Sequence, residues 1–244
     1  MAETIINPLP ITISTTLSPI TCNGANDASI TTLVTDGVEP DTFAWTGPNA
    51  FSSTDADIFN LEPGTYELTV TDDNLCQEST IVIVEEPELL VLTSSIVDVS
   101  CEGLLDGEID LNIVGGTPGY TISWTGPDGF ISDQEDLSAL AAGSYDVSVE
   151  DLNGCVQVLN AIVDEPALLE VSIDVTQISC FGADNGALDA TVVGGTAPYN
   201  VLWTGPNGFS ETTEDISNLL EGDYDIVVSD DNSCEFTASI NIAE

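Results

Sequence analysis

The stretch GSYDVSVEDLNGC, residues 143–155, carries the pattern that decides the fold. Its first half alternates between apolar and polar side chains, which is typical of a half-buried β-strand. Its second half contains Asp, Asn and Gly, the residues that favour a tight turn, and it ends in a cysteine. The stretches 64–76 and 222–234 have the same pattern. The sequence therefore predicts the same strand and turn three times.

Cysteine, tryptophan, tyrosine and proline recur along the chain with a fixed period of 79. The recurring positions are Cys22, Cys101 and Cys180; Cys76, Cys155 and Cys234; Trp45, Trp124 and Trp203; Tyr66, Tyr145 and Tyr224; and Pro8, Pro87 and Pro166. This period predicts a leader, or the end of a preceding repeat, at 1–7, followed by repeats at 8–86, 87–165 and 166–244. Because the last residue stands one position before the next expected proline, we expect the chain to be a segment of a longer array.

Strand and turn signals dominate each repeat and predict an all-β fold. Turn residues punctuate the sequence every 8–12 positions, Thr, Val and Ile are plentiful, and no long amphipathic helix is indicated. Six or seven short strands in a repeat of this length make a small Ig-like β-sandwich. Residues 133–140 fit either one helical turn or an edge strand. The true immunoglobulin signature is absent, because Tyr66 precedes Cys76 by ten residues rather than two.

The junctions between repeats predict a stiff connection. Residues 85–88 and 164–167 are too short for a flexible linker, and each contains a proline, which has a fixed φ and no N–H. Like charge on neighbouring repeats also favours extension, within a Debye length of about 8 Å at physiological salt. We therefore expect three tandem sandwiches arranged as an extended rod.

The charge balance excludes several classes of protein. The chain has 43 acidic residues and no Lys, Arg or His, giving a formal net charge of −43. Such a chain cannot neutralise phosphates, which excludes nucleic-acid binding and electrostatic docking on anionic lipid. It also lacks the bases and ligands of His- or Lys-dependent catalysis and of histidine zinc sites, so we expect no enzyme and no catalytic residue. No run of 18 apolar residues exists, so we expect no membrane insertion.

The cysteines predict disulfide bonds and an oxidising compartment. Pairing within each repeat, Cys22–Cys76, Cys101–Cys155 and Cys180–Cys234, uses all six cysteines and repeats identically. Pairing across the junctions, Cys76–Cys101 and Cys155–Cys180, would leave Cys22 and Cys234 without partners. Each closed loop would stabilise its repeat by roughly 4 kcal/mol in the chain-entropy model. Disulfides place the protein outside the cytosol. The alternative is six reduced, buried thiols.

An ordered set of motifs resembles the SprB repeat, named from the large gliding-motility adhesin of Bacteroidota. In the second repeat these motifs are VSCEG at 99–103, GGTPGY at 115–120, Trp124 and GSYDVSVEDLNGC at 143–155. The third repeat matches nearly as well, whereas the first departs at Ala28 and at 36–38. The resemblance implies a surface-exposed, multi-repeat protein exported by the type IX secretion system, serving as an adhesin or the stalk of one. It implies no catalytic residue and no known ligand.

An aromatic element recurs at 45–51, 124–130 and 203–209, reading Trp-Thr-Gly-Pro-(Asn/Asp)-(Ala/Gly)-Phe. One interpretation is a core Trp followed by a Gly-Pro turn, with the Phe closing over the edge of the sandwich. The other is an exposed aromatic platform on which sugars stack.

Acidic residues also recur, at 72–74, 151–153 and 230–232, and at Asp57, Asp136 and Asp215. Oxygen ligands suit Ca²⁺, although no EF-hand spacing is present. The simpler interpretation is an Asx-type hairpin turn, in which the side chains bond their own backbone. We therefore assign no metal ligand and no cofactor, with Ca²⁺ as the alternative.

These observations favour a structural stalk or spacer of a secreted cell-surface repeat adhesin. Its partners would be neighbouring repeats of the same parent chain, with extracellular polysaccharide or a surface as a further class. Two alternatives remain: a polysaccharide- or Ca²⁺-dependent binding module, and a subunit of an extracellular filament.

Overall fold

The computed structural model describes residues 9–243, and these residues form an all-β chain. The expected leader at 1–7, the first residue of the first repeat, Pro8, and the last residue, Glu244, lie outside the described residues. Within 9–243 the helical elements are single 3-10 turns, η1 (Pro48–Ala50), η2 (Pro127–Gly129) and η3 (Pro206–Gly208). No helix of the described part is long and apolar enough to cross a membrane.

The strands form three sets whose bounds recur with the same period as the cysteines. The first set is β1 (Thr12–Ser18), β2 (Ala28–Thr35), β3 (Thr42–Thr46), β4 (Ser52–Ser53), β5 (Ile58–Leu61), β6 (Gly64–Thr71) and β7 (Gln77–Val84). The second is β8 (Val91–Val97), β9 (Gly107–Val114), β10 (Thr121–Thr125), β11 (Ile131–Ser132), β12 (Leu137–Leu140), β13 (Gly143–Glu150) and β14 (Val156–Val163). The third is β15 (Glu170–Thr176), β16 (Gly186–Val193), β17 (Asn200–Thr204), β18 (Ser210–Glu211), β19 (Ile216–Leu219), β20 (Gly222–Ser229) and β21 (Glu235–Ile242). Residues 133–140, for which two interpretations were open, thus contribute the strand β12.

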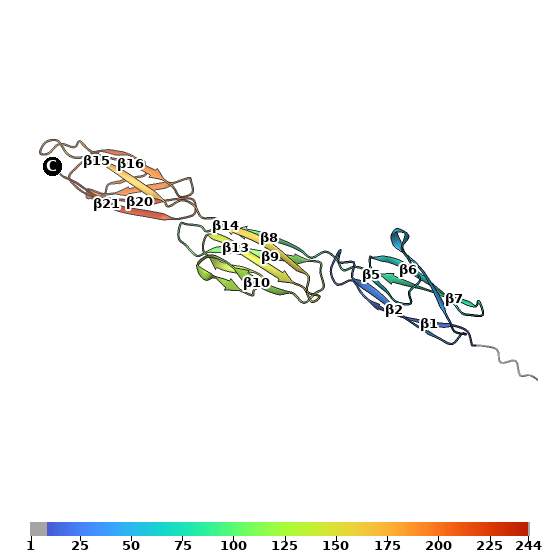
Figure 1. Cartoon of the computed structure of the whole chain (residues 1–244). Coiled ribbons are helices and arrows are strands. Elements are labelled where there is room, and N and C mark those ends of the chain that lie inside the picture. The colour runs from blue at the N-terminus through green and yellow to red at the C-terminus, as the bar shows by residue number, and fades with distance from the viewer. Residues whose placement is uncertain (1–8, 244) are drawn as a thin grey trace, which may run out of the picture. The chain divides into compact units, whose positions relative to one another are not determined.

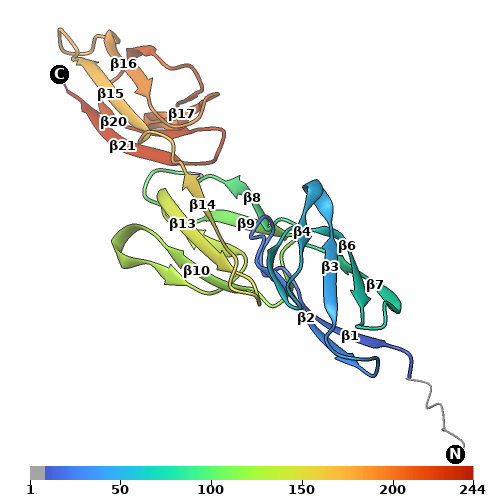
Figure 2. The same cartoon turned by 45° about the vertical axis from the view of Figure 1, so that its right-hand side comes forward.

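Each set forms a three-stranded and a four-stranded sheet. In the first set the orders are β1-β2-β5 and β4-β3-β6-β7, and neighbouring strands are antiparallel. Figure 1 shows β1 beside β2, and Figure 2 shows β3, β6 and β7 in the other sheet. The predicted Ig-like β-sandwich is confirmed. The short strand β4 pairs with β3 and so joins the four-stranded sheet, whereas the fourth strand of a constant-type Ig domain lies in the sheet of the first strand.

The described chain groups into two compact units. Unit 1 contains the chain up to Thr93 together with 112–123 and 147–159, and unit 2 contains 94–111, 124–146 and the chain from Asn160 onward. The division into repeats at 8–86, 87–165 and 166–244, and the extended rod, stay predictions.

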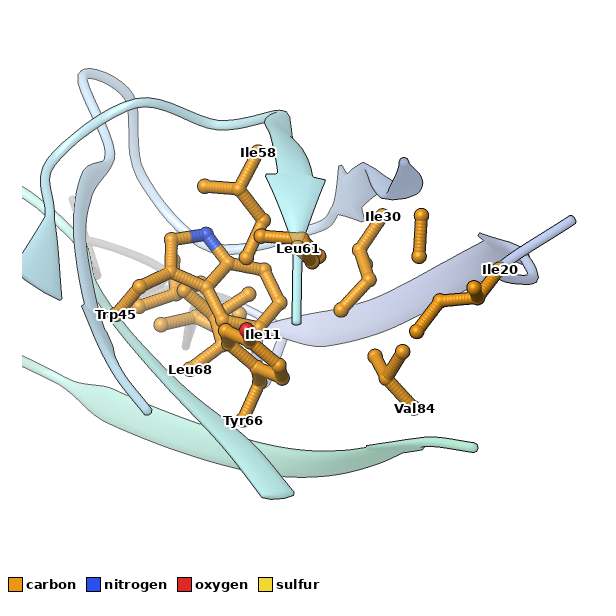
Figure 3. Packing of buried hydrophobic residues seen from close by; sticks show 11 residues of the cluster. Ile11, Ile20, Ile30, Trp45, Ile58, Leu61, Tyr66, Leu68 and Val84 are labelled. Atoms are coloured by element: carbon orange, nitrogen blue, oxygen red, sulfur yellow. The ribbon is translucent and has the colours of Figure 1, made fainter. Parts of the chain in front are cut away.

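A buried tryptophan lies at the centre of each sandwich core. Trp45 is 1% exposed, and Figure 3 shows Ile58, Leu61, Tyr66 and Leu68 around its indole ring. Alternation on β6 turns Tyr66, Leu68 and Val70 inward and leaves the residues between them more exposed. Trp124 and Trp203 are equally buried. The core interpretation of the aromatic element is confirmed, and a sugar-stacking platform on these tryptophans is wrong.

The Gly-Pro turn after the tryptophan and the Gly-x-Tyr segment interlock. A Cβ on Gly47 would lie 2.7 Å from the Tyr66 ring, and a Cβ on Gly64 would lie 2.8 Å from the ring of Pro48. Phe51 packs edge-on against Tyr66 with ring centroids 5.3 Å apart. The Tyr66 hydroxyl donates a hydrogen bond to the Glu62 carbonyl (3.1 Å), as in the tyrosine corner of other β-sandwiches. Burial raises the pKa of the Tyr66 hydroxyl.

Replacing Trp124 by Ala should lower the free energy of unfolding by about 3–5 kcal/mol, because the substitution leaves a large cavity in the core. Urea denaturation measures the loss. The matched control is Ile131→Ala, whose side chain is 78% exposed and whose loss should stay within about 0.5 kcal/mol. A Trp124→Ala variant as stable as the control would contradict the core assignment.

Candidate functional site

Two disulfides join cysteines that lie far apart in the chain, with a sequence separation of 133 in each case. The bonds are Cys22–Cys155 and Cys101–Cys234, each with a Cα–Cα distance of 5.7 Å. The predicted pairing within repeats, Cys22–Cys76, Cys101–Cys155 and Cys180–Cys234, is therefore wrong. The two remaining cysteines, Cys76 and Cys180, are free and exposed. Each bond connects the first cysteine of one period to the second cysteine of the next.

The pairing follows from the length of one strand, because the two cysteines of a repeat lie at opposite ends of it. Cys22 precedes β2, whose eight residues lead to the turn at 36–38. That turn lies beside Cys76, since Asp72 accepts hydrogen bonds from the backbone N–H of Val38 (3.2 Å) and of Cys76 (2.8 Å). An eight-residue strand spans about 25 Å, whereas a disulfide needs Cα atoms within about 7 Å.

The third repeat has the same arrangement. Asp230 accepts hydrogen bonds from Thr196 N (2.7 Å) and Cys234 N (2.8 Å), at the far end of β16 from Cys180. The backbone N–H of Ile178, two residues before Cys180, instead donates to the Ala243 carbonyl beyond the end of β21. Hence the first cysteine of a strand set lies near the end of the last strand of that set, and the second lies near the start of the first strand.

A buried aspartate holds the second cysteine of each repeat in place. Asp151 is 4% exposed, and its carboxylate accepts hydrogen bonds from the backbone N–H of Thr117 (2.7 Å), Asn153 (2.9 Å) and Cys155 (2.9 Å). Asp72 and Asp230 are buried at the same position and accept the equivalent bonds from residues 76 and 234. These turns have the Asx-type geometry expected from the sequence.

Two opposing effects set the pKa of the Asp151 carboxyl. Burial alone would raise this pKa, but the hydrogen bonds from the backbone N–H groups of Thr117, Cys155, Asn153 and Gly154 outweigh burial and lower it. The charged form of Asp151 is therefore the form that the fold favours.

A second recurring aspartate forms hydrogen bonds within the loop that carries the first cysteine. The backbone N–H and the hydroxyl of Thr21 donate to the two carboxylate oxygens of Asp27, at 2.9 and 2.6 Å. Ser100 makes the same two bonds to Asp106. The hydroxyl bond, followed by the backbone bond, lowers the pKa of each of these aspartates. In the third repeat Asn185 takes this place and bonds both Ser179 N (3.1 Å) and Ser179 Oγ (2.7 Å).

Hydrogen bonds accompany each disulfide. The Asn153 side-chain amide donates to the Thr21 carbonyl (3.1 Å), and Asn232 donates in the same way to the Ser100 carbonyl (2.8 Å). Next to these bonds, Gly24 N donates to the Glu86 carboxylate at 2.9 Å. Gly103 N makes the equivalent bond to Glu165 at 2.8 Å. A joint thus consists of the peptide linker, one disulfide and a small set of oriented hydrogen bonds.

An open pocket lies beside each disulfide. The pocket at Cys22–Cys155 has a volume of about 360 Å³ and includes Asn23, Leu89 and Gly154 in its lining. The pocket at Cys101–Cys234 has a volume of about 320 Å³ and includes Glu102, Leu168 and Ser233. The residue after the first cysteine and the residue before the second therefore line the same pocket in both joints.

The other recurring acids also serve the backbone. Asp57, Asp136 and Asp215 accept hydrogen bonds from the N–H groups of Thr32 (2.8 Å), Leu111 (3.1 Å) and Ala190 (3.2 Å), respectively. The Coulomb repulsion of Asp215, then burial, then further acidic neighbours raise the pKa of the exposed Asp189 carboxyl. No group of three or more Cys, Asp or Glu side chains within residues 9–243 is arranged to hold a metal ion.

The sequence model of the SprB repeat matches the chain at residues 93–129 and 172–208. These two segments stand one period apart, in the predicted second and third repeats, and they confirm the family resemblance there. No curated protein matches the chain.

Solved structures with Ig domains are similar to the chain at low sequence identity. The eight N-terminal Ig domains of Down Syndrome Cell Adhesion Molecule isoform 1.30.30 share 14% identity, with a TM-score of 0.43 over 90% of this chain and 34% of that one. Murine CEACAM1b shares 15% identity, with a TM-score of 0.25 over 58% of this chain and 93% of that one. The chain thus spans about a third of the first structure, and likeness at these TM-scores carries no argument about function.

The oxidised monomer should contain two disulfides and two titratable thiols in denaturant, because only four of its cysteines have partners within the chain. Mass spectrometry should give an intact mass about 4 Da below that of the all-thiol chain, two hydrogens for each bond. Digestion with a Glu-specific protease should release the Cys22–Cys155 and Cys101–Cys234 peptide pairs. A Cys22–Cys76 pair would contradict the structure.

Replacing Asp151 by Asn should lower the free energy of unfolding by about 1–3 kcal/mol at pH 7, because an amide cannot accept all the backbone bonds. The folded-state pKa of Asp151 is lowered, so its contribution is present above the unfolded pKa of about 3.9 and is lost as the pH falls through the folded value. The gap between wild type and variant should therefore shrink below about pH 4, as measured by denaturation at several pH values. Exposed Asp231→Asn is the control; a gap independent of pH would contradict the assignment.

Proposed function

We propose that the chain is a structural stalk or spacer segment of a secreted, cell-surface repeat adhesin of the SprB type. The observation that carries the proposal is the doubled covalent connection at each joint. The peptide linker at 85–88 is accompanied by Cys22–Cys155, and the linker at 164–167 by Cys101–Cys234. A stalk has to transmit load between its ends, and a doubled connection serves that purpose directly.

The two disulfides close loops that overlap. One loop runs from 22 to 155 and the other from 101 to 234, so every peptide bond between 22 and 234 lies inside at least one loop. A single backbone cleavage anywhere in this range leaves the two parts covalently joined. Disulfides within repeats would have left 77–100 and 156–179 outside any loop. With the overlapping disulfides, one cleavage in a junction does not separate the chain into two parts. With disulfides inside each repeat, the same cleavage would separate it.

The overlapping loops also limit extension. Along the shortest covalent path the chain from 9 to 243 can stretch to about 270 Å when oxidised, against about 820 Å when fully reduced. Reduction thus changes the reach of the unfolded chain about threefold. A segment with this property remains short even after its sandwiches unfold under load.

The proposed location follows from the redox state. Disulfides persist in oxidising surroundings, which supports a place outside the cytosol on the cell surface. The resemblance to SprB repeats extends the proposal to export by type IX secretion and to association with gliding motility. Neighbouring repeats of the same parent chain are the proposed partners, and the joints described above are the surfaces they would share.

The absence of Lys and Arg makes a sharp test of covalent continuity available. The substitution Glu88→Lys introduces the sole trypsin site into an exposed junction, inside the loop closed by Cys22–Cys155. After trypsin treatment the oxidised monomer of this variant should migrate as one species on a denaturing gel without reductant, and as two fragments with reductant.

Two further variants serve as controls for that gel. Glu88→Lys with Cys22→Ser should separate into two fragments even without reductant, because its junction has lost the second connection. Glu88→Lys with Cys76→Ser should behave like the parent, because Cys76 is free. Separation of the parent without reductant would overturn the proposed role of the joints.

A further inference from the structure

The two free thiols occupy positions that are bonded elsewhere in the chain. Cys76 stands one and two periods before Cys155 and Cys234, the two cysteines that accept a bond from the preceding repeat. Cys180 stands at the position of Cys22 and Cys101, which bond to the following repeat. One free thiol is therefore of the first kind and the other of the second. Together they are the two halves of one further joint.

We propose that this joint forms between two copies of the chain, with Cys180 of one copy bonded to Cys76 of the next. The contact is heterologous, because the two surfaces differ, and the resulting dimer retains one unused surface of each kind. Such contacts do not close on themselves, so copies add head to tail into a covalent strand.

The residues beside the free thiols favour a second copy as the partner. Phe181, directly after Cys180, is 94% exposed, and Leu75, directly before Cys76, is 81% exposed. At the bonded cysteines the same two positions hold polar or small residues, and both line the pocket beside the disulfide. These residues are Asn23 with Gly154, and Glu102 with Ser233. In a Cys180–Cys76 joint, Phe181 and Leu75 would line the same pocket and cover each other's apolar surface.

The hydrogen-bonding groups of the joint are also present on both surfaces. Asn74 occupies the position of Asn153 and Asn232, whose side-chain amides donate across the bonded joints. Ser179 occupies the position of Thr21 and Ser100, whose carbonyls accept those bonds, and Asn185 closes its loop as Asp27 closes that of Thr21. Asn74 of one copy would accordingly donate to the Ser179 carbonyl of the other.

Formation of the bond requires an oxidant, for which we name a low-molecular-weight disulfide such as oxidised glutathione. One cysteine thiolate attacks the glutathione disulfide, forms a mixed disulfide and releases one glutathione thiolate. The thiolate of the second copy then attacks the protein sulfur of that mixed disulfide and releases the second glutathione. Two cysteine thiols lose two protons and two electrons in all, and one glutathione disulfide is reduced to two glutathione molecules.

The test mixes two full-length variants that each retain one free thiol. Cys180→Ser keeps Cys76, and Cys76→Ser keeps Cys180; one variant carries an isotope label so that all dimers differ in mass. Equal amounts are oxidised with glutathione disulfide in about 0.5 M NaCl, which screens the repulsion between two strongly acidic chains. Chance coupling would give the mixed dimer in half of the product. We expect it in more than nine tenths, with a Cys76–Cys180 peptide in the digest.

A matched variant separates docking from simple thiol reactivity. Phe181→Glu in the Cys76→Ser background leaves Cys180 in place but removes the exposed apolar side chain that would cover Leu75 of the other copy. The preference for the mixed dimer should fall toward one half. A chance distribution with the unmodified pair, or glutathione-capped monomers alone, would overturn the proposal. The partners of Cys76 and Cys180 would then be repeats with a different sequence. The trypsin test reads only the Cys22–Cys155 joint, and its Cys76→Ser variant gives the same readout although it cannot form the joint between copies, so the two proposals can fail separately.

Discussion

A disulfide can bridge only backbone positions within about 7 Å, and one eight-residue strand holds the two cysteines of a repeat about 25 Å apart. This constraint determines how the repeats are connected. Cys22 lies at the end from which the chain leaves the sandwich, and Cys76 lies beside the start of the first strand. The nearest partner of each cysteine is therefore in another strand set. The disulfide does not close a loop within one sandwich but adds a second covalent connection between two sandwiches.

The absence of cations explains why the acids are placed as they are. Without Lys, Arg or His, no carboxylate can form an ion pair with a side chain, so the buried ones must accept hydrogen bonds from backbone N–H groups. Asp72, Asp151 and Asp230 do so in the turns that carry the second cysteine. Where two carboxylates lie side by side they repel each other, and the charge of Asp215 raises the pKa of the neighbouring Asp189 carboxyl. The buried aspartates thus fix the turns that carry the second cysteine of each disulfide.

Local signals in the sequence were sufficient for most of the fold. Alternation at 143–150 predicted β13, the Asp-Asn-Gly segment predicted the turn after it, and the core was one of two interpretations of the element beginning at Trp124. The segment 133–140 was ambiguous because four residues of β12 are too few for periodicity to distinguish a strand from a helical turn. The tyrosine corner was overlooked, because the spacing of Tyr66 from Cys76 was compared with that of immunoglobulins, whereas the Tyr66 hydroxyl bonds the carbonyl of Glu62.

The sequence by itself determined the period, the strand-rich character of each period, the buried tryptophans and the turn chemistry of the aspartates. All of these depend on residues close together in the chain or on the simple rule that apolar side chains are buried. Only the tertiary structure decided the partners of the six cysteines. That choice depends on which end of a sandwich each loop reaches, and the end is set by strand length and direction together. The spacing of the cysteines along the chain does not reveal at which end of a sandwich each cysteine lies.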